Sequence, residues 1–135
     1  MGNGYIQSVI TSYGDGHHDA PTGPAVFVDT RVLRNPPEDP EVRERMLHSN
    51  GLDREVRRYV MATPGARGLV KEGAEKVLSL LRQDAGTNRV DVHVMCGGGR
   101  HRSVAVAEEI ASYLRGADVD CEVEHRHINR PILPH

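Results

Sequence analysis

Residues 89–114 constrain the fold more than any other part of the chain, because they combine three local patterns in one order. Residues 89–95 alternate apolar and polar side chains, as a strand does, and run into three consecutive glycines at 97–99. Residues 103–114 then place apolar side chains along one helical face. A strand, a glycine loop and a helix in this order indicate an α/β fold with parallel strands.

The rest of the chain supplies the other elements of such a fold. With 135 residues and no internal repeat or linker, the chain is expected to form a single domain over 1–135. We predict a three-layer α/β domain with a mostly parallel sheet of about four strands and flanking helices. The remaining strands are expected at 5–10, 25–28 and 119–128, the helices at 40–49, 53–62 and from 64 to just before 86, and loops at 12–24, 31–40 and from 131 onward.

Composition and charge exclude several classes of protein. Hydrophobic residues make up 38% of the chain and aromatic residues 4%, so the core should consist of Val, Leu, Ile and Ala. A formal net charge of −2 argues against a surface that is a nucleic-acid footprint throughout. The chain has two cysteines, no signal peptide and no apolar run long enough to span a membrane, so we expect a cytoplasmic protein.

The glycine loop has the composition of an anion-binding site. Successive main-chain amides in a glycine-rich turn form a concave nest for anions, and a helix N-terminus adds partial positive charge. Arg102 offers a planar fork for phosphate oxygens, while Arg100 and His101 add positive potential and donors. Ser103 is expected either to cap the helix or to bond the sulfur of Cys96. The alternative is a plain tight turn with solvated arginines.

Two pairs of residues outside the loop are candidates for the same site. Asp29 and Arg31 follow a buried strand, where they either line the crevice beside the loop or form an ion pair that fixes the turn. His125 and Arg126 belong to the last predicted strand. Because side chains alternate across a strand, only one of these two is easily directed into a site.

Polar residues in the first predicted loop look like metal ligands at first sight. The residues concerned are Asp15, His17, His18 and Asp19, which have neither the spacing of a helix-face pair nor a cysteine partner. We therefore expect no metal and no cofactor, and interpret the segment as a mobile polar loop that closes over a ligand. Arginines mixed with acids over 43–58 are interpreted as solvated helix faces, with a subunit contact left open.

The loop resembles the Cys-x5-Arg signature of protein tyrosine phosphatases and related cysteine phosphatases. That resemblance implies Cys96 as the nucleophile, Arg102 as the phosphate ligand and Ser103 as an aid to the leaving thiolate. A helix N-terminus beside arginines favours a thiolate at such a position. No general acid is evident, and Asp15, Asp19 and Asp29 are only guesses for that role.

A longer resemblance, over about residues 5–128, is to the C-terminal domain of the RapZ family of RNase adapter proteins, and several separated motifs in one order make it more specific. It implies a sensor of a phosphorylated amino sugar, glucosamine-6-phosphate, with small RNA and a nuclease as partners of the full-length adapter, and members that form oligomers. The motifs are Asp29, Arg31, Leu33, Asn35 and Pro36, then Cys96 with the glycines and His101, Arg102, Ser103 and Val104, and finally His125 with Arg126.

The sequence also departs from this family pattern. It contains no Walker A motif, so hydrolysis of ATP or GTP is not implied. Its tail has Arg126 and Arg130 but no lysine, which weakens the expectation of RNA binding. Gly97 and Arg100 stand where the family has Thr and Gln. We therefore expect a binding module for a small phosphorylated metabolite, with a Cys96-dependent phosphatase and an RNA-binding adapter as the alternatives.

Overall fold

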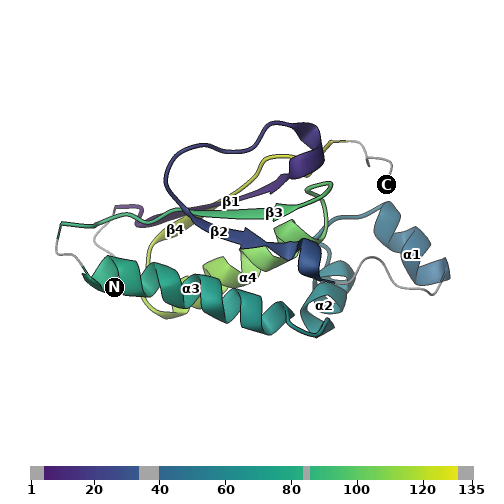
Figure 1. The fold of residues 1–135 in the computed structure, drawn as a ribbon. Coiled ribbons are helices and arrows are strands. Elements are labelled where there is room, and N and C mark those ends of the chain that lie inside the picture. Colours follow the sequence, from purple (N-terminus) through teal and green to yellow (C-terminus); the bar gives the residue numbers. More distant parts are fainter. Residues whose placement is uncertain (1–4, 34–39, 84–85, 131–135) are drawn as a thin grey trace.

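A computed structural model describes residues 5–33, 40–83 and 86–130 (Figure 1). Four parallel strands form one sheet in the order β2-β3-β1-β4. The predicted α/β fold with a parallel four-stranded sheet is therefore confirmed. The strands are β1 (Ser8–Gly14), β2 (Val26–Asp29), β3 (Val92–Cys96) and β4 (Cys121–His125).

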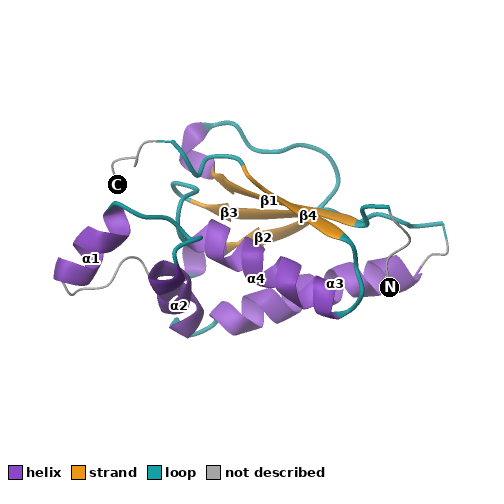
Figure 2. Cartoon of the chain, turned by 180° about the vertical axis from the view of Figure 1, so that it is seen from behind, coloured by secondary structure: helices purple, strands orange, loops and turns teal. Residues whose placement is uncertain are grey.

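The two long helices lie on one face of the sheet. Helix α4 packs against β1, β3 and β4, while α3 packs against β2 and against α4. The segment between β1 and β2 passes over the opposite face of the sheet (Figures 1 and 2). The helices are α1 (Pro40–Leu47), α2 (Arg54–Ala62), α3 (Ala66–Gln83) and α4 (Arg102–Gly116).

The core is aliphatic, as the composition predicts. Ile10 and Val94 of the two central strands are fully buried, and so are Ile110 and Leu114 of α4. Three alanines of α4 are also fully buried, which lets this helix lie close to the sheet because their side chains are short. Helix α4 thus packs closely on the sheet, and the glycine loop lies directly before its first turn.

The first strand differs from its prediction. It was expected at 5–10, but β1 covers Ser8–Gly14 and so extends into the predicted loop. Its last residue, Gly14, is in register with Cys96 of β3. Ser12 is polar yet fully buried, and its hydroxyl lies 2.6 Å from Nδ1 of His125. Polar residues of this kind obscure a strand in the sequence, because their burial depends on partners from distant segments.

The last strand also ends earlier than predicted. It was expected at 119–128, whereas β4 ends at His125. The N–H of Arg126 still donates to the carbonyl of Ser12, and a turn then follows in which Arg130 N–H donates to the carbonyl of His127. The expected alternation of side chains therefore does not continue beyond the end of β4.

The predicted loops are partly structured. Asp15–His17 and Thr30–Val32 each form one 3-10 turn, and the second overlaps the start of the segment at 31–40 that was expected to be irregular. Asn35, Pro36 and the tail from residue 131 lie outside the described residues, so their predicted roles are not addressed.

Helix α2 begins with a capping aspartate, and its removal is expected to cost stability. Oδ1 of Asp53 accepts hydrogen bonds from the N–H groups of Glu55 (2.8 Å) and Val56 (3.3 Å). Asp53→Ala should lower the free energy of unfolding by about 1 kcal/mol, because these two donors lose their acceptor. Urea denaturation measures the change, and Asp53→Ser, which can still cap, should stay close to wild type. Equal losses in both variants would contradict the capping role.

Candidate functional site

The glycine loop lies at the carboxyl edge of the sheet, between the end of β3 and the start of α4 (Figure 1). In parallel sheets this edge is where ligands usually bind. The end of β1 lies beside the loop, since Gly16 N–H donates to the carbonyl of Gly97 at 3.0 Å. The end of β2 lies beside β3, where Asp29 is in register with Met95.

The three glycines of the loop have different structural roles. Gly99 has φ +79°, and a Cβ atom there would lie 2.6 Å from the nitrogen of Gly14. Gly14 approaches the loop as closely, since a Cβ atom added at Gly14 would lie 2.4 Å from the carbonyl carbon of Gly98. By contrast, a Cβ on Gly97 or Gly98 would meet no atom within 4 Å. Geometry therefore requires glycine at 14 and 99, while 97 and 98 leave open space above the loop.

The sulfur of Cys96 lies beneath the loop. It accepts a hydrogen bond from the N–H of Gly99 at 3.0 Å and lies 3.1 Å from the hydroxyl oxygen of Ser103. Ser103 thus bonds the sulfur and does not cap α4, whose N-cap residue is His101. Cys96 itself is only 3% exposed.

Several main-chain N–H groups of the loop have no acceptor. Among the described residues, nothing accepts a hydrogen bond from the N–H of Gly97, Gly98 or Arg100. The carbonyl of Gly98, in contrast, lies 3.1 Å from Nε2 of His17. Unpaired donors at the start of a 15-residue helix are the ordinary requirement for an anion site.

The basic side chains of the loop bind neighbouring carbonyl groups. Arg102 donates from Nη1 to the carbonyl oxygens of Leu33 (3.0 Å) and Arg31 (3.4 Å), so it reaches the end of β2. Arg100 donates to the carbonyl oxygens of Ser49 and Arg130, both at 3.2 Å. Nε2 of His101 lies 3.0 Å from the carbonyl of Ser49. These contacts hold the loop between distant segments and keep cationic groups around it.

Asp29 and Arg31 form an ion pair at the same sheet edge. Nη2 of Arg31 lies 2.9 Å from Oδ2 of Asp29, and the N–H of Arg31 donates to Oδ1 at 2.9 Å. The hydrogen bonds from Arg31 hold the pKa of Asp29 below its usual value. The pair therefore fixes the turn after β2, which is one of the two roles expected for it. It also places its charges next to the carbonyl group of Arg31, to which Arg102 donates.

His125 and Arg126 point to different parts of the molecule. His125 lies between β1 and α4, with Nδ1 at 2.6 Å from the Ser12 hydroxyl and Nε2 at 2.8 Å from Oε2 of Glu108. Arg126 binds the carboxylate of Asp19, in the segment between β1 and β2, at 3.2 and 3.3 Å. The two residues are neighbours in sequence, but the chain turns between them.

His127 is the residue that sequence reasoning missed. Its side chain is fully buried, its Nδ1 accepts a hydrogen bond from Gly14 N–H at 2.8 Å, and its Nε2 lies 3.4 Å from Oδ2 of Asp19. Its ring lies 4.6 Å from the ring of His17. His127 thus joins the end of β1 to the segment over the loop. Its position in a predicted strand, one residue after Arg126 and two after His125, gave no signal of this.

The environment of His127 predicts a pH-dependent stability. Burial holds its pKa below the ordinary 6.5, and burial does the same for His93. As the pH falls through 6.5, these two histidines therefore bind protons in the unfolded chain before they do so in the folded one, so their contribution to stability should be fully present well above pH 6.5 and be lost as the pH drops. Urea denaturation between pH 7.5 and about 5 measures the slope. His127→Asn, whose Oδ1 can still accept from Gly14, should have a smaller slope, and an unchanged slope would contradict this assignment.

Other site types find less support in the described part of the chain. Within 5–33, 40–83 and 86–130, no three His, Cys, Asp or Glu side chains are grouped closely enough to hold a metal ion. None of the helices described there is both long and apolar enough to cross a membrane. Cys121 is buried as expected, and burial raises the pKa of its thiol.

The fold and the loop define a class: a parallel α/β domain with a glycine loop and a helix N-terminus at the carboxyl edge of its sheet. Within this class the chain belongs to the RapZ C-terminal domain family, whose model matches residues 6–129. The resemblance noted in the sequence is therefore confirmed.

The curated relatives are longer proteins. A nucleotide-binding protein of Corynebacterium diphtheriae is 38% identical over 93% of this chain and 42% of the relative. A nucleotide-binding protein of Rubrobacter xylanophilus is 39% identical over 92% of this chain and 41% of the relative. A third, from Thermobifida fusca, is 35% identical over 93% and 42%. The chain thus spans about two fifths of the length of these relatives.

Proposed function

We propose that this chain binds a small phosphorylated metabolite, a sugar phosphate such as glucosamine-6-phosphate, in the loop at 97–103. One observation carries the proposal: three main-chain N–H groups of this loop have no acceptor among the described residues, and they precede a helix N-terminus. Open space at Gly97 and Gly98 leaves room for a phosphoryl group above them. Phosphate oxygens accept hydrogen bonds from such groups and interact favourably with the helix dipole.

The surroundings of the loop support a doubly charged ligand. Arg102 donates hydrogen bonds from Nη1 to the carbonyl oxygens of Leu33 and Arg31. Its other N–H donors are therefore left for an anion. The RapZ family resemblance implies an amino sugar phosphate, and the motif residues that carry the resemblance include His101, Arg102 and Ser103. We propose that Asp29 and Arg31 act on this site through the turn that Arg102 binds. We propose that His125 and Arg126 act on it indirectly, the first through Ser12 of β1 and the second through Asp19, which also lies against His127.

Nucleotides share the phosphate chemistry and belong in the test. The curated relatives are called nucleotide-binding proteins, and this chain corresponds to about two fifths of their length. The sequence holds no Walker A motif, and we propose that the phosphates of a nucleotide would compete for the loop at 97–103. We therefore propose that a sugar phosphate binds more tightly than ATP or GTP.

A Cys96-dependent phosphatase is the second candidate, because the sulfur lies under the loop and contacts Gly99 N–H and the Ser103 hydroxyl. Two observations favour binding without turnover. Cys96 is almost fully buried. Hydrogen bonds from Arg126 and Arg31 hold the pKa of Asp19 and of Asp29, respectively, below the usual value, so neither is a ready general acid at neutral pH.

Calorimetry and a turnover assay separate the two functions. The chain should bind glucosamine-6-phosphate saturably and glucosamine, which lacks the phosphate, not measurably. It should release no nitrophenol from p-nitrophenyl phosphate. Turnover that Cys96→Ser abolishes would replace the binding function by the enzyme. Equal affinity for glucosamine with and without its phosphate would contradict the proposed site.

A further inference from the structure

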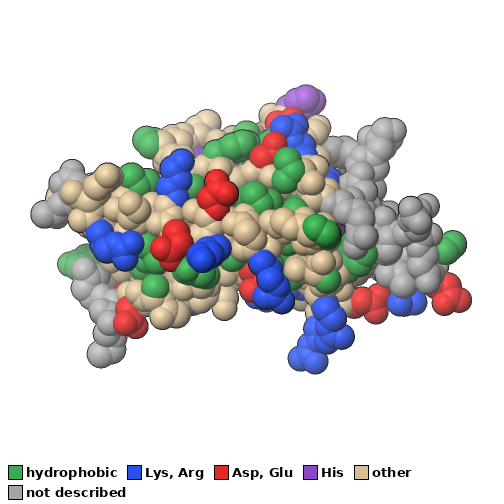
Figure 3. Space-filling model, turned by 60° about the horizontal axis from the view of Figure 1, so that its bottom comes forward, with side chains coloured by type: hydrophobic (Ala, Val, Ile, Leu, Met, Phe, Trp, Pro, Cys, Tyr) green, Lys and Arg blue, Asp and Glu red, His purple; other side chains and the backbone are tan. Residues whose placement is uncertain are grey.

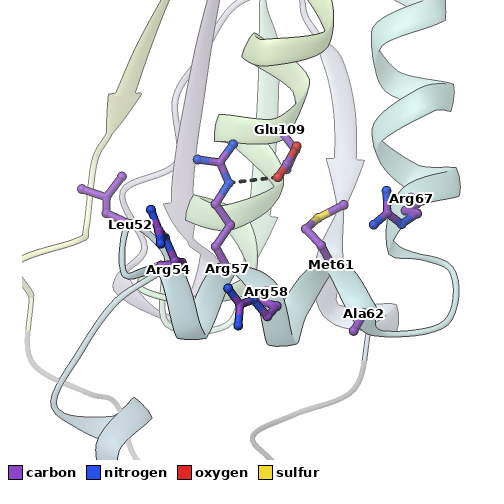
Figure 4. A pocket seen from close by; sticks show the side chains of 8 residues that line it. All are labelled: Leu52, Arg54, Arg57, Arg58, Met61, Ala62, Arg67 and Glu109. Carbon is purple, nitrogen blue, oxygen red and sulfur yellow. Dashed lines mark hydrogen bonds and ion pairs between the residues drawn. The ribbon is translucent and has the colours of Figure 1, made fainter.

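A second basic site lies away from the glycine loop, in a groove between α2, α3 and α4 (Figure 4). Its volume is about 500 Å³, and no residue of 97–103 lines it. Four arginines line this groove together with a single carboxylate, Glu109 of α4. The complete lining is Leu52, Arg54, Arg57, Arg58, Met61, Ala62, Arg67 and Glu109.

The arginines of the groove carry an excess of positive charge. Arg57 pairs with Glu109 at 3.0 Å, as the dashed line in Figure 4 marks. Arg54, Arg58 and Arg67 form no ion pair or hydrogen bond with any residue that the structure describes. The groove therefore has three cations without an ionic partner in the described part of the chain, although the whole chain has a formal net charge of −2. Such a local concentration attracts an anionic partner.

The fold does not account for these arginines. Arg54 is the first residue of α2, where the helix dipole disfavours a cation. Arg58 stands four residues further on the same helix face, and like charges at this spacing destabilise a helix. The buried side of α2 is made by Val56 and Val60 and needs no arginine. The stability of α2 therefore does not explain why arginine stands at 54 and 58, and such positions are where a function is to be sought.

The groove continues into a neighbouring hollow and is partly apolar, which limits what it can hold. A second hollow of about 330 Å³ adjoins it and shares Met61, Arg67 and Glu109. Leu52, beside the first hollow, is half exposed. On the face formed by the helices, basic side chains stand beside hydrophobic ones (Figure 3). Two adjoining hollows with both kinds of surface suit a stretch of polypeptide better than a single small ion.

The residue types favour a protein partner over a nucleic acid. Arginine and methionine are enriched in protein–protein interfaces, whereas lysine is depleted there, and the two hollows together hold four arginines, one methionine and one lysine, Lys71. Tyr113 in the second hollow is the only aromatic residue in either lining. Single-stranded nucleic acids usually need several aromatic platforms.

We propose that this groove binds an acidic segment of a partner protein. Carboxylates of the segment pair with Arg54, Arg58 and Arg67, and its apolar side chains lie on Met61 and Leu52. Guanidinium groups bind carboxylates in a bidentate manner, so the three arginines set the register of the segment. The inference is independent of the phosphate site, because the two sites share no lining residue.

Selection from a random peptide library displayed on phage tests this inference with the full chain as target. Peptides rich in Glu, Asp and Leu should be enriched, and fluorescence anisotropy then measures the affinity of a synthetic labelled copy. The double variant Arg58→Glu/Arg67→Glu should weaken binding about 30-fold or more, since two ion pairs become repulsive contacts. The matched control Arg82→Glu, at an exposed position near the end of α3, should bind like wild type.

Two further measurements make the result decisive. Thermal unfolding checks that the double variant is folded, and its calorimetric affinity for glucosamine-6-phosphate should be unchanged, which separates this groove from the glycine loop. Selection of no acidic peptides would overturn the proposal, and so would equal binding by the double variant. Binding of a single-stranded RNA oligonucleotide through Arg58 and Arg67, with no peptide binding, would also overturn it.

Discussion

Gly99→Ala is expected to lower the free energy of unfolding by about 3 kcal/mol or more. Residue 99 has φ +79°, a conformation that costs an alanine about 1 to 2 kcal/mol. The new Cβ would also lie 2.6 Å from the nitrogen of Gly14 and 2.9 Å from Cβ of His127. Neither neighbour moves easily, because Gly14 ends a central strand and His127 is fully buried.

Gly97→Ala is the matched control for Gly99→Ala. It lies in the same loop, but its Cβ would meet nothing within 4 Å, so its free energy of unfolding should change by only about 0.5 kcal/mol or less. Urea denaturation followed by circular dichroism measures both variants. Gly14→Ala should resemble Gly99→Ala, since its Cβ would lie 2.4 Å from the carbonyl carbon of Gly98. Similar stabilities for Gly97→Ala and Gly99→Ala would contradict the close approach of β1 and the loop.

The second large effect concerns binding. Arg102→Ala should weaken the binding of glucosamine-6-phosphate by about 2 to 4 kcal/mol, or about 30-fold to 1,000-fold. The substitution removes a charge-assisted contact to a partly desolvated anion, and the remaining main-chain donors do not replace its charge. Calorimetric titration of both proteins with the same ligand measures the difference.

Two controls separate the loss of ligand contacts from a loss of structure. Arg102 also donates to the carbonyls of Leu33 and Arg31, so the free energy of unfolding of the variant must be measured beside its affinity. Arg102→Lys keeps the charge but loses the planar fork, and an intermediate affinity is expected. An unchanged dissociation constant in a folded Arg102→Ala protein would remove Arg102 from the site.

Much of the fold was predictable because its signals are local. The alternation in 89–95, the glycines after it and the helical spacing of 103–114 are all contained in one stretch. These patterns predicted the bounds of β3, of the loop and of α4 to within a few residues. The motif pattern likewise indicated the RapZ C-terminal family, which the family match confirms.

The errors fall where an element depends on a distant partner. The sequence around Ser12 reads as a loop, yet Ser12 lies in β1 because β3 and β4 pair with that strand on both sides. His127 reads as an ordinary strand residue, yet the turn after β4 directs it to Gly14. The arginines of α2 are interpreted as a solvated face, and Arg54 and Arg58 are indeed exposed; what the sequence does not indicate is that they line one groove with Arg67 of another helix.

By itself the sequence determined the class of fold, the order of the elements and the loop composed of glycines and basic residues, since these depend on periodicity and residue type along a short stretch. Only the tertiary structure decided which glycines are sterically required, where each basic side chain binds and which residues from separate helices form a groove. The physical reason is that close approaches, hydrogen bonds and clusters of like charge depend on contacts between residues that are far apart in sequence. A pattern within one short stretch does not determine which distant residues come into contact.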